Sequence, residues 1–255
     1  MLQTLGVVLF PHREPGRQGG SSAVSLAHRK IGGQQLLEWV VRRVTESQRL
    51  DRVIAVVGNG VEDTLVADQV PLDVPVYRGD HPDPLARVAG ALREFSARSV
   101  VLVSADNPFV DPVLLDRLVS TACDNPGVDY VSYRSGDGRP AIQSRLGLFA
   151  EWCTSAALRV ADKEASHARD RSKVTPYVYS HPERFTLRLL PMPVELDRQD
   201  VRLTIDVEED WEHAEAIFDA LGPESLDWQG IAGLLEQQPA LRQRMALLNR
   251  EAAGR

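Results

Sequence analysis

Apolar residues in the first half of the chain alternate between short continuous runs and stripes at helical spacing. The runs predict strands at residues 4–10, 52–57, 74–78 and 100–104, and the stripes predict helices at residues 34–47, 61–70, 83–95 and from residue 111. The run at 100–104 shows no polar alternation, which is typical of a strand buried on both faces of a parallel sheet. The pattern therefore predicts an α/β fold with a mostly parallel sheet flanked by helices.

The second half of the chain has a less regular pattern. It predicts strands at 128–133, 184–190 and 201–205, a turn at 135–140, and helices within 146–161, at 208–221 and in two amphipathic segments after residue 223. We expect a single domain whose core comprises residues 1–127 and 201–222. Residues 128–200 would form a small irregular lobe, and residues 223–255 a C-terminal helical tail.

Two of the predicted strands end beside an aspartate. Asp106 follows the run at 100–104, and Asp206 follows the run at 201–205. Ligands of open α/β sheets bind outside the carboxyl ends of the strands, so both carboxylates are candidates for one site. Paired carboxylates hold Mg²⁺ against substrate phosphates, because this hard cation prefers oxygen ligands. The alternative for Asp106 is an acidic turn residue or the N-cap of the following helix.

A long loop at residues 10–33 follows the first predicted strand and is rich in glycine, serine, histidine and arginine. A long loop at this place in an α/β fold is a candidate phosphate site, and the alternative is an ordinary surface loop. Backbone N–H groups could form an anion nest, and nearby cations could add positive charge. The candidates are Gly19, Gly20, Ser21 and Ser22 for the nest and Arg13, Arg17, Arg29 and Lys30 for the charge. The loop contains neither a P-loop motif nor a dinucleotide-binding motif.

The composition excludes several classes of protein. The chain has 255 residues and a net charge of −7, so it lacks the basic surface of a nucleic-acid-binding protein. Its two cysteines, Cys123 and Cys153, form no zinc or disulfide pattern and favour a reducing compartment. The N-terminal run lacks a basic flank and is too short for a membrane span. We expect a cytoplasmic enzyme or binding protein, with no nucleic-acid or membrane partner.

Several sequence blocks resemble those of one enzyme family. The blocks are IGGQQLLEWVVRRV, VPVYRGDHPDPLARVAGALREF, SADNPFVDP followed by DYVS, RSKVTPYVYSHPERF and VRLTIDVEEDWEHAEAIF, and they occur in the family's order across nearly the whole chain. The chain resembles the cytidylyltransferases of the spore-coat polysaccharide and acylneuraminate type. The resemblance implies the nucleotide-diphospho-sugar transferase fold, which is Rossmann-like, and assigns acceptor binding and homodimer formation to the irregular lobe.

The same resemblance implies a reaction and a set of site residues. CMP would pass from CTP to a sugar or sugar acid of a surface polysaccharide or glycoconjugate, pyrophosphate would leave, and Mg²⁺ would be the cofactor. Asp106 and Asp206 would be the catalytic metal ligands. The remaining implied residues are Arg78 and Arg87 near the nucleotide phosphates and Arg171, Thr175 and Arg202 on the substrate side.

The chain also departs from the family pattern. Leu26, Gln34 and Ala86 stand near or at positions where the family has lysine, lysine and aspartate, and Lys173 replaces a histidine. The acceptor-side segment reads PAIQSRLGLF instead of the family's motif. Each lost cation weakens the binding of a triphosphate. Two alternatives to an active cytidylyltransferase therefore stay open: a binding or regulatory subunit without catalysis, and a glycosyltransferase on the same fold.

Overall fold

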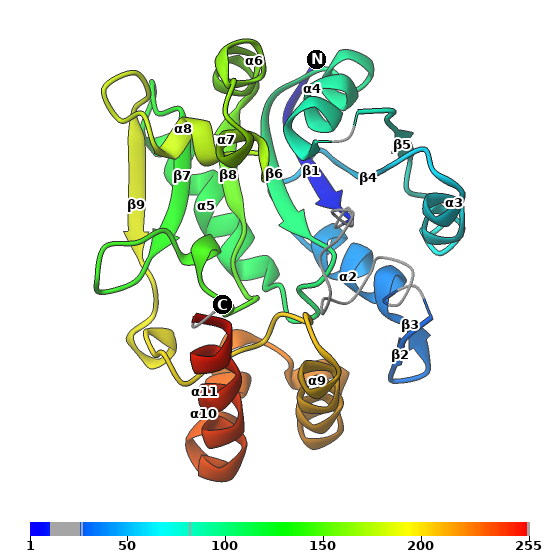
Figure 1. The fold of residues 1–255 in the computed structure, drawn as a ribbon, viewed down its shortest axis with the longest axis vertical. Helices are drawn as coiled ribbons and strands as arrows, with labels where there is room; N and C mark the ends of the chain where they lie inside the picture. The colour runs from blue at the N-terminus through cyan, green and yellow to red at the C-terminus, as the bar shows by residue number, and fades with distance from the viewer. Residues whose placement is uncertain (11–25, 27, 82, 254–255) are drawn as a thin grey trace.

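The fold is built on one mixed sheet. The structure is a computed structural model that describes residues 1–10, 26, 28–81 and 83–253, and in these residues a seven-stranded sheet has the order β5-β4-β1-β6-β8-β7-β9 (Figure 1). The strands are β1 (Leu2–Leu9), β4 (Arg52–Val57), β5 (Val76–Arg78), β6 (Ala97–Ser104), β7 (Tyr130–Arg134), β8 (Glu151–Thr154) and β9 (Leu187–Pro191). The short strands β2 (Lys30–Ile31) and β3 (Gln34–Gln35) form a separate hairpin.

The first four strands of the large sheet are parallel, as the alternating pattern predicts. β1 lies between β4 and β6, and β4 pairs with β5. Along β6, Val101 and Val103 join one hydrophobic cluster, whereas Val100 and Leu102 join the other. The apolar run at 100–103 is therefore a strand buried on both faces, and this prediction is confirmed.

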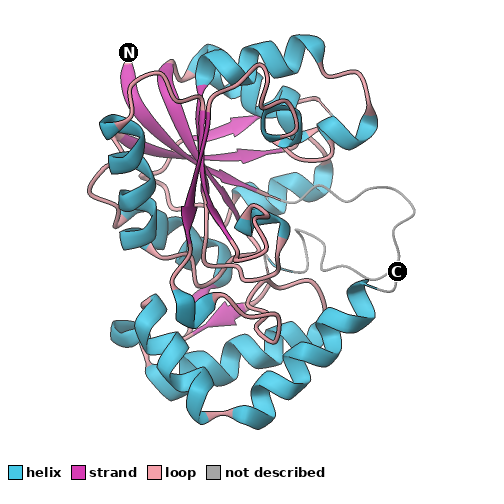
Figure 2. Cartoon of the chain, turned by 90° about the vertical axis from the view of Figure 1, so that its left-hand side faces the viewer, coloured by secondary structure: helices cyan, strands magenta, loops and turns pink. Residues whose placement is uncertain are grey.

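Helices cover both faces of the sheet (Figure 2). The first face packs against α2 (Leu36–Thr45), α3 (Val61–Ala67) and α5 (Pro112–Asp124), and the second against α4 (Pro84–Glu94), α6 (Ser155–Glu164) and α8 (Pro176–Tyr179). The short helix α7 (Ala168–Arg171) precedes α8, and single 3₁₀ turns lie at Ala141–Gln143, Val194–Leu196 and Pro223–Ser225. Asp111 caps α5 with hydrogen bonds from the backbone of Val113 (2.9 Å) and Leu114 (3.1 Å).

Two parts of the second half differ from the sequence-based prediction. Residues 151–154, predicted within a helical region, form β8, which inserts antiparallel between β6 and β7. Residues 201–205, predicted as a strand, are irregular. Their backbone N–H groups donate to carbonyls of two different segments, at Arg145 and Asp106, instead of forming one ladder. An apolar run alone does not distinguish these two arrangements.

Three C-terminal helices close the carboxyl end of the parallel strands: α9 (Glu208–Leu221), α10 (Trp228–Gln237) and α11 (Pro239–Ala253) (Figure 1). Their apolar side chains belong to the same buried cluster as β1 and α2, which extends from Val8 to Met245. The backbone N–H of Trp228 donates to Asp111 at 2.8 Å, which fixes α10 to the start of α5. None of the helices in the described ranges is long and apolar enough to span a membrane.

Candidate active site

One backbone hydrogen bond brings the two predicted aspartates to the same place. Asp106 lies just beyond the end of β6, and its carbonyl accepts a hydrogen bond from the N–H of Ile205 at 2.9 Å. Asp206 is the next residue, so two aspartates a hundred positions apart in the sequence lie on neighbouring backbone segments. Asp106 follows β6 as the sequence predicts, whereas the segment before Asp206 is not a strand, and the metal-binding role of both aspartates remains a prediction.

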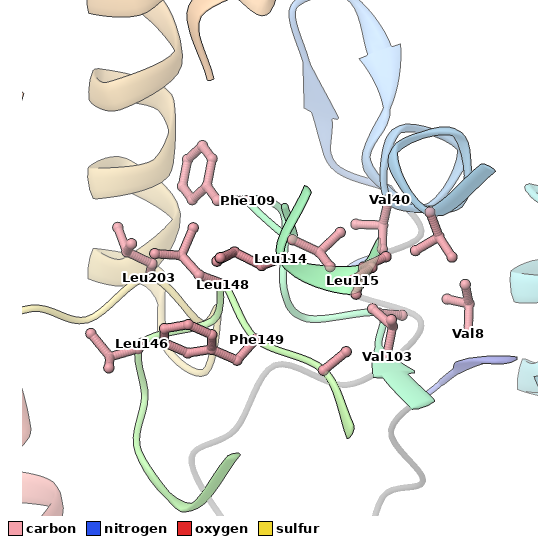
Figure 3. Packing of buried hydrophobic residues seen from close by; sticks show 14 of the residues in the cluster. Val8, Val40, Val103, Phe109, Leu114, Leu115, Leu146, Leu148, Phe149 and Leu203 are labelled. Atoms are coloured by element: carbon pink, nitrogen blue, oxygen red, sulfur yellow. The ribbon is translucent and has the colours of Figure 1, made fainter. Parts of the chain in front are cut away.

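A third segment, residues 145–147, contacts the residues that precede Asp206. The carbonyl of Arg145 accepts hydrogen bonds from the N–H groups of Leu203 (2.8 Å) and Thr204 (3.2 Å). Gly147 has φ +65°, and a Cβ there would lie 2.7 Å from the carbonyl carbon of Leu203. Figure 3 shows the side chains of Leu146, Leu148 and Phe149 gathered with Leu203 in the hydrophobic core. Residues 145–147 are thus held tightly against residues 203–204.

Asp206 is surrounded by two arginines. It forms an ion pair with Arg145 and accepts a second contact from Arg202 at 3.2 Å. Arg202 is buried and binds Asp210 through two hydrogen bonds of 2.5 and 2.7 Å. Asp210 also accepts the backbone N–H groups of Asp206 (2.9 Å) and Val207 (3.1 Å), so it caps α9 and orients the residue before the helix.

Asp106 is half-buried, and this burial raises the pKa of its carboxyl. A hydrogen bond with Ser104 and the positive charges of Lys173 and Arg145 act in the opposite direction. A carboxylate in such a place gains from an additional cation, because desolvation penalises its charged form. Lys173 and Arg145 supply positive charge beside Asp106, and a metal-binding role for Asp106 remains a prediction.

Glu151 is a third carboxylate, and the sequence reasoning did not include it. It is buried on β8 and accepts hydrogen bonds from the hydroxyls of Tyr130 and Thr175, the latter at 2.6 Å. Burial raises its pKa, and these hydrogen bonds and the charge of Lys173 oppose the shift. The sequence does hold a signal, a single glutamate within the apolar run LGLFAEWC. Thr175, predicted on the substrate side, is buried and orients this carboxylate.

The predicted phosphate-binding residues divide into two groups. Arg13, Arg17, Gly19, Gly20 and Ser21 lie outside the described residues.

In the described residues, Lys30 is exposed on β2, and Arg78 at the end of β5 donates to the hydroxyl of Thr64 at 3.1 Å. Arg87 is buried in α4, its Nε has no hydrogen-bond partner among the described residues, and burial lowers its pKa. The nucleotide-binding role of these residues remains a prediction.

Arg171, predicted on the substrate side, has strong intramolecular partners. Its guanidinium donates to Asp83, the N-cap of α4, at 3.1 and 3.2 Å and to Asp162 in α6 at 2.6 Å. Arg171 therefore joins α7 to α4 and α6, and a contact with substrate remains a prediction for it.

Comparisons with known proteins agree with this architecture. The chain is 31% identical over 217 residues to the uncharacterised protein MJ1063 of Methanocaldococcus jannaschii, and the match covers 84% of each chain. It is 27% identical over 212 residues to the spore coat polysaccharide biosynthesis protein SpsF of Bacillus subtilis, covering 81% of this chain and 85% of SpsF.

Solved structures share the fold. A cytidylyltransferase from Leptospira borgpetersenii superposes with a TM-score of 0.76 at 20% identity, covering 95% of this chain and 96% of that one. A CMP:2-keto-3-deoxy-manno-octonic acid synthetase complexed with CTP superposes with a TM-score of 0.62 at 10% identity, covering 86% and 99%. The sequence profile of the family described as "Cytidylyltransferase" matches residues 27–251. The chain therefore belongs to the cytidylyltransferase family.

Proposed function

We propose that this protein transfers CMP from CTP to a sugar or sugar acid used for a surface polysaccharide or glycoconjugate. The observation that carries the proposal is the hydrogen bond from Ile205 to Asp106, which makes Asp106 and Asp206 neighbours at the end of β6. The similarity to SpsF and to a synthetase complexed with CTP supports the biosynthetic setting and the nucleotide.

The proposed reaction is a single displacement at phosphorus. A hydroxyl oxygen of the acceptor bonds to the α-phosphorus of CTP, while the bond from that phosphorus to the bridging oxygen of the β-phosphate breaks. The hydroxyl proton passes to solvent and pyrophosphate leaves. Catalysis then consists mainly of holding the reactants in place and stabilising the charge on the phosphates.

The residues at this place suit a magnesium ion. Mg²⁺ is usually held by one or two carboxylates and completes its shell with water and phosphate oxygens. No cluster of three or more candidate ligands occurs in the described residues, so the Asp106–Asp206 pair fits that mode rather than an all-protein cage. When bound, Mg²⁺ would neutralise charge on the transferred nucleotidyl group.

Unpaired polar atoms flank the same pair. Asn107 Oδ1, Thr204 Oγ1 and Arg202 Nη1 are buried and have no hydrogen-bond partner within the described ranges. Buried polar atoms in folded proteins normally have a partner, which an ordered water molecule or a bound polar ligand can supply. In the proposal, Arg78, Arg87 and Lys30 add positive charge for the nucleotide, and Arg202 orients Asp206.

The test is turnover with CTP and Mg²⁺ over a panel of sugars and sugar acids, measured as pyrophosphate release. Asp106→Asn and Asp206→Asn should each lower kcat/KM by about 100-fold or more, because several kcal/mol of charge stabilisation are lost at tenfold per 1.36 kcal/mol. Asp219→Asn, at an exposed position on α9, serves as the matched control and should keep the wild-type rate.

Two results would contradict the proposal. Wild-type protein that binds CTP with Mg²⁺ but releases no pyrophosphate with any acceptor would indicate a binding or regulatory subunit. Turnover that survives Asp106→Asn would remove the aspartate pair from the mechanism.

A further inference from the structure

A guanidinium already contacts Asp206, one of the two proposed metal ligands. Arg145 forms an ion pair with Asp206, and its charge also acts on Asp106. Both partners of the ion pair are about one-third exposed, at 35% and 31%, so the pair can open without unpacking the core. The charge of Asp206 is thus balanced by an arginine of this chain itself.

The backbone holds Arg145 at this place. Its carbonyl accepts two N–H groups, and the close approach of Gly147 to Leu203 fixes the following turn. Leu146 and Leu148 anchor the segment in the core beside Leu203 (Figure 3). The guanidinium can change its partner by side-chain rotation, but the segment that carries it cannot leave the site.

Arg145 and Arg202 both contact the same oxygen of Asp206, Oδ2, and a divalent cation on that oxygen would be repelled by any guanidinium charge that no other carboxylate balances. Arg202 is buried and its charge is balanced by Asp210, whereas Arg145 is partly exposed, so a metal ion that takes Asp206 Oδ2 would displace Arg145. The displaced guanidinium remains beside the metal, where the phosphates of a nucleoside triphosphate would be bound. Arginine matches phosphate oxygens in a bidentate geometry, so a triphosphate offers it a new partner.

We propose that Arg145 is an exchangeable counter-cation, which pairs with Asp206 when no metal is bound and turns to the polyphosphate of the nucleotide when a divalent metal takes Asp206. This inference rests on the proposed function for the identity of the nucleotide. It assigns Arg145 a substrate-binding role in addition to its ion pair with Asp206. It also predicts opposite effects of Arg145 on the binding of metal alone and of nucleotide.

The experiment measures binding rather than turnover. Mn²⁺ affinity without nucleotide is determined from the electron paramagnetic resonance signal of free Mn²⁺, and CTP affinity at saturating Mn²⁺ by calorimetry. Arg145→Gln should bind Mn²⁺ up to about fivefold more tightly, the equivalent of a partly exposed ion pair. The same variant should bind CTP about tenfold or more weakly, because a charge-assisted phosphate contact is lost.

Two further variants make the result specific. Arg139→Gln removes an arginine of the same region that is 75% exposed and paired with Asp137, and both affinities should stay at the wild-type value. Arg145→Lys keeps the positive charge and should retain the weak Mn²⁺ binding of the wild type. It also gives a second measurement if Arg145→Gln folds poorly.

Opposite changes in the two affinities support the inference, since a merely structural role would weaken both. An unchanged or weaker Mn²⁺ affinity in Arg145→Gln overturns it. If the wild-type protein releases no pyrophosphate, the proposed function fails. That result does not decide whether Arg145 competes with the metal, because the Mn²⁺ affinities answer this question separately.

Discussion

At the level of single residues, Glu151 is an example of a buried acidic side chain with several hydrogen-bond donors around it. Its carboxylate lies on β8 with hydroxyl donors from Tyr130 and Thr175, and with Lys173 as a nearby positive charge. Burial nevertheless dominates and raises its pKa above the ordinary 4.5. The charged form of Glu151 therefore destabilises the folded protein relative to the unfolded chain.

Replacing Glu151 by glutamine should remove this pH-dependent penalty. Because the folded-state pKa is raised, the favourable contribution is complete below pH 4.5 and is lost as pH rises through the folded pKa. Glu151→Gln should therefore gain stability relative to wild type as pH increases from 4 to 8. The check is the difference in urea-unfolding free energy between the two proteins at each pH.

The control for this prediction is Glu212→Gln, at an exposed position on α9. A difference between wild type and Glu151→Gln that stays constant from pH 4 to 8 would contradict the assignment of a raised pKa to Glu151.

The sequence identifies some of the candidate site residues but not others, and the difference has a physical reason. Asp106 and Asp206 follow apolar runs, so a local rule identifies them. Arg145 reaches the site only because residues 145 and 203–204 pair through backbone hydrogen bonds, and no local pattern encodes that pairing. Arg171 illustrates the reverse, since sequence similarity cannot reveal its partners Asp83 and Asp162.

At the scale of elements, the contact between residues 145–147 and 203–204 determines the geometry of the site. Gly147→Ala should disturb it, because alanine at φ +65° is strained and its Cβ would lie 2.7–2.8 Å from backbone atoms of Leu203 and Thr204. We expect a loss of about 2–5 kcal/mol from the left-handed conformation and the overpacking together. Urea unfolding measures the loss, and CTP binding should weaken with it.

Gly138→Ala is the matched control, because Gly138 also has positive φ, at +87°, but a Cβ there would meet no atom within 4 Å. Equal losses for the two variants would show that backbone strain alone matters and that the close approach to Leu203 does not.

Element boundaries in the parallel half follow from the sequence more closely than those in the lobe. The strand predicted at 52–57 is observed as Arg52–Val57, because its apolar run ends at a glycine-rich turn. The sequence pattern does not predict β8. Its four residues form one end of a longer apolar segment, and no pattern separates them from the helix α6 that follows. Pairing with β6 and β7, at long range, makes it a strand.

At the scale of the whole molecule, the C-terminal tail shares the core instead of forming a separate unit. One buried cluster joins Val8 in β1 to Met245 in α11, and Arg43 of α2 donates to the carbonyl of Leu226 at 2.9 Å. The division of this single domain into a core, a lobe and a tail remains a prediction. Dimer formation through residues 128–193 is likewise a prediction, which light scattering can test.

A cavity made in the tail should therefore destabilise the whole molecule. Leu235 of α10 is 2% exposed, and Leu235→Ala should cost about 2–5 kcal/mol of unfolding free energy. Far-UV circular dichroism and tryptophan fluorescence should shift to the same lower urea midpoint. Leu247→Ala, at a position 50% exposed on α11, should have a much smaller effect. An early transition confined to part of the signal would mean that the tail unfolds by itself.

The hydrogen bonds that align residues 106, 145 and 203–205 are all made by backbone groups. Any residue except proline supplies the same N–H and C=O, so this frame does not depend on which side chains it carries. The family resemblance implies that the segment PAIQSRLGLF binds the acceptor, and we therefore expect substitutions at its exposed residues, Gln143 and Ser144, to alter acceptor choice while the aspartates keep their positions. Divergence of specificity on a constant catalytic frame is then an expected evolutionary path, and directed evolution of this protein would start from the same few positions.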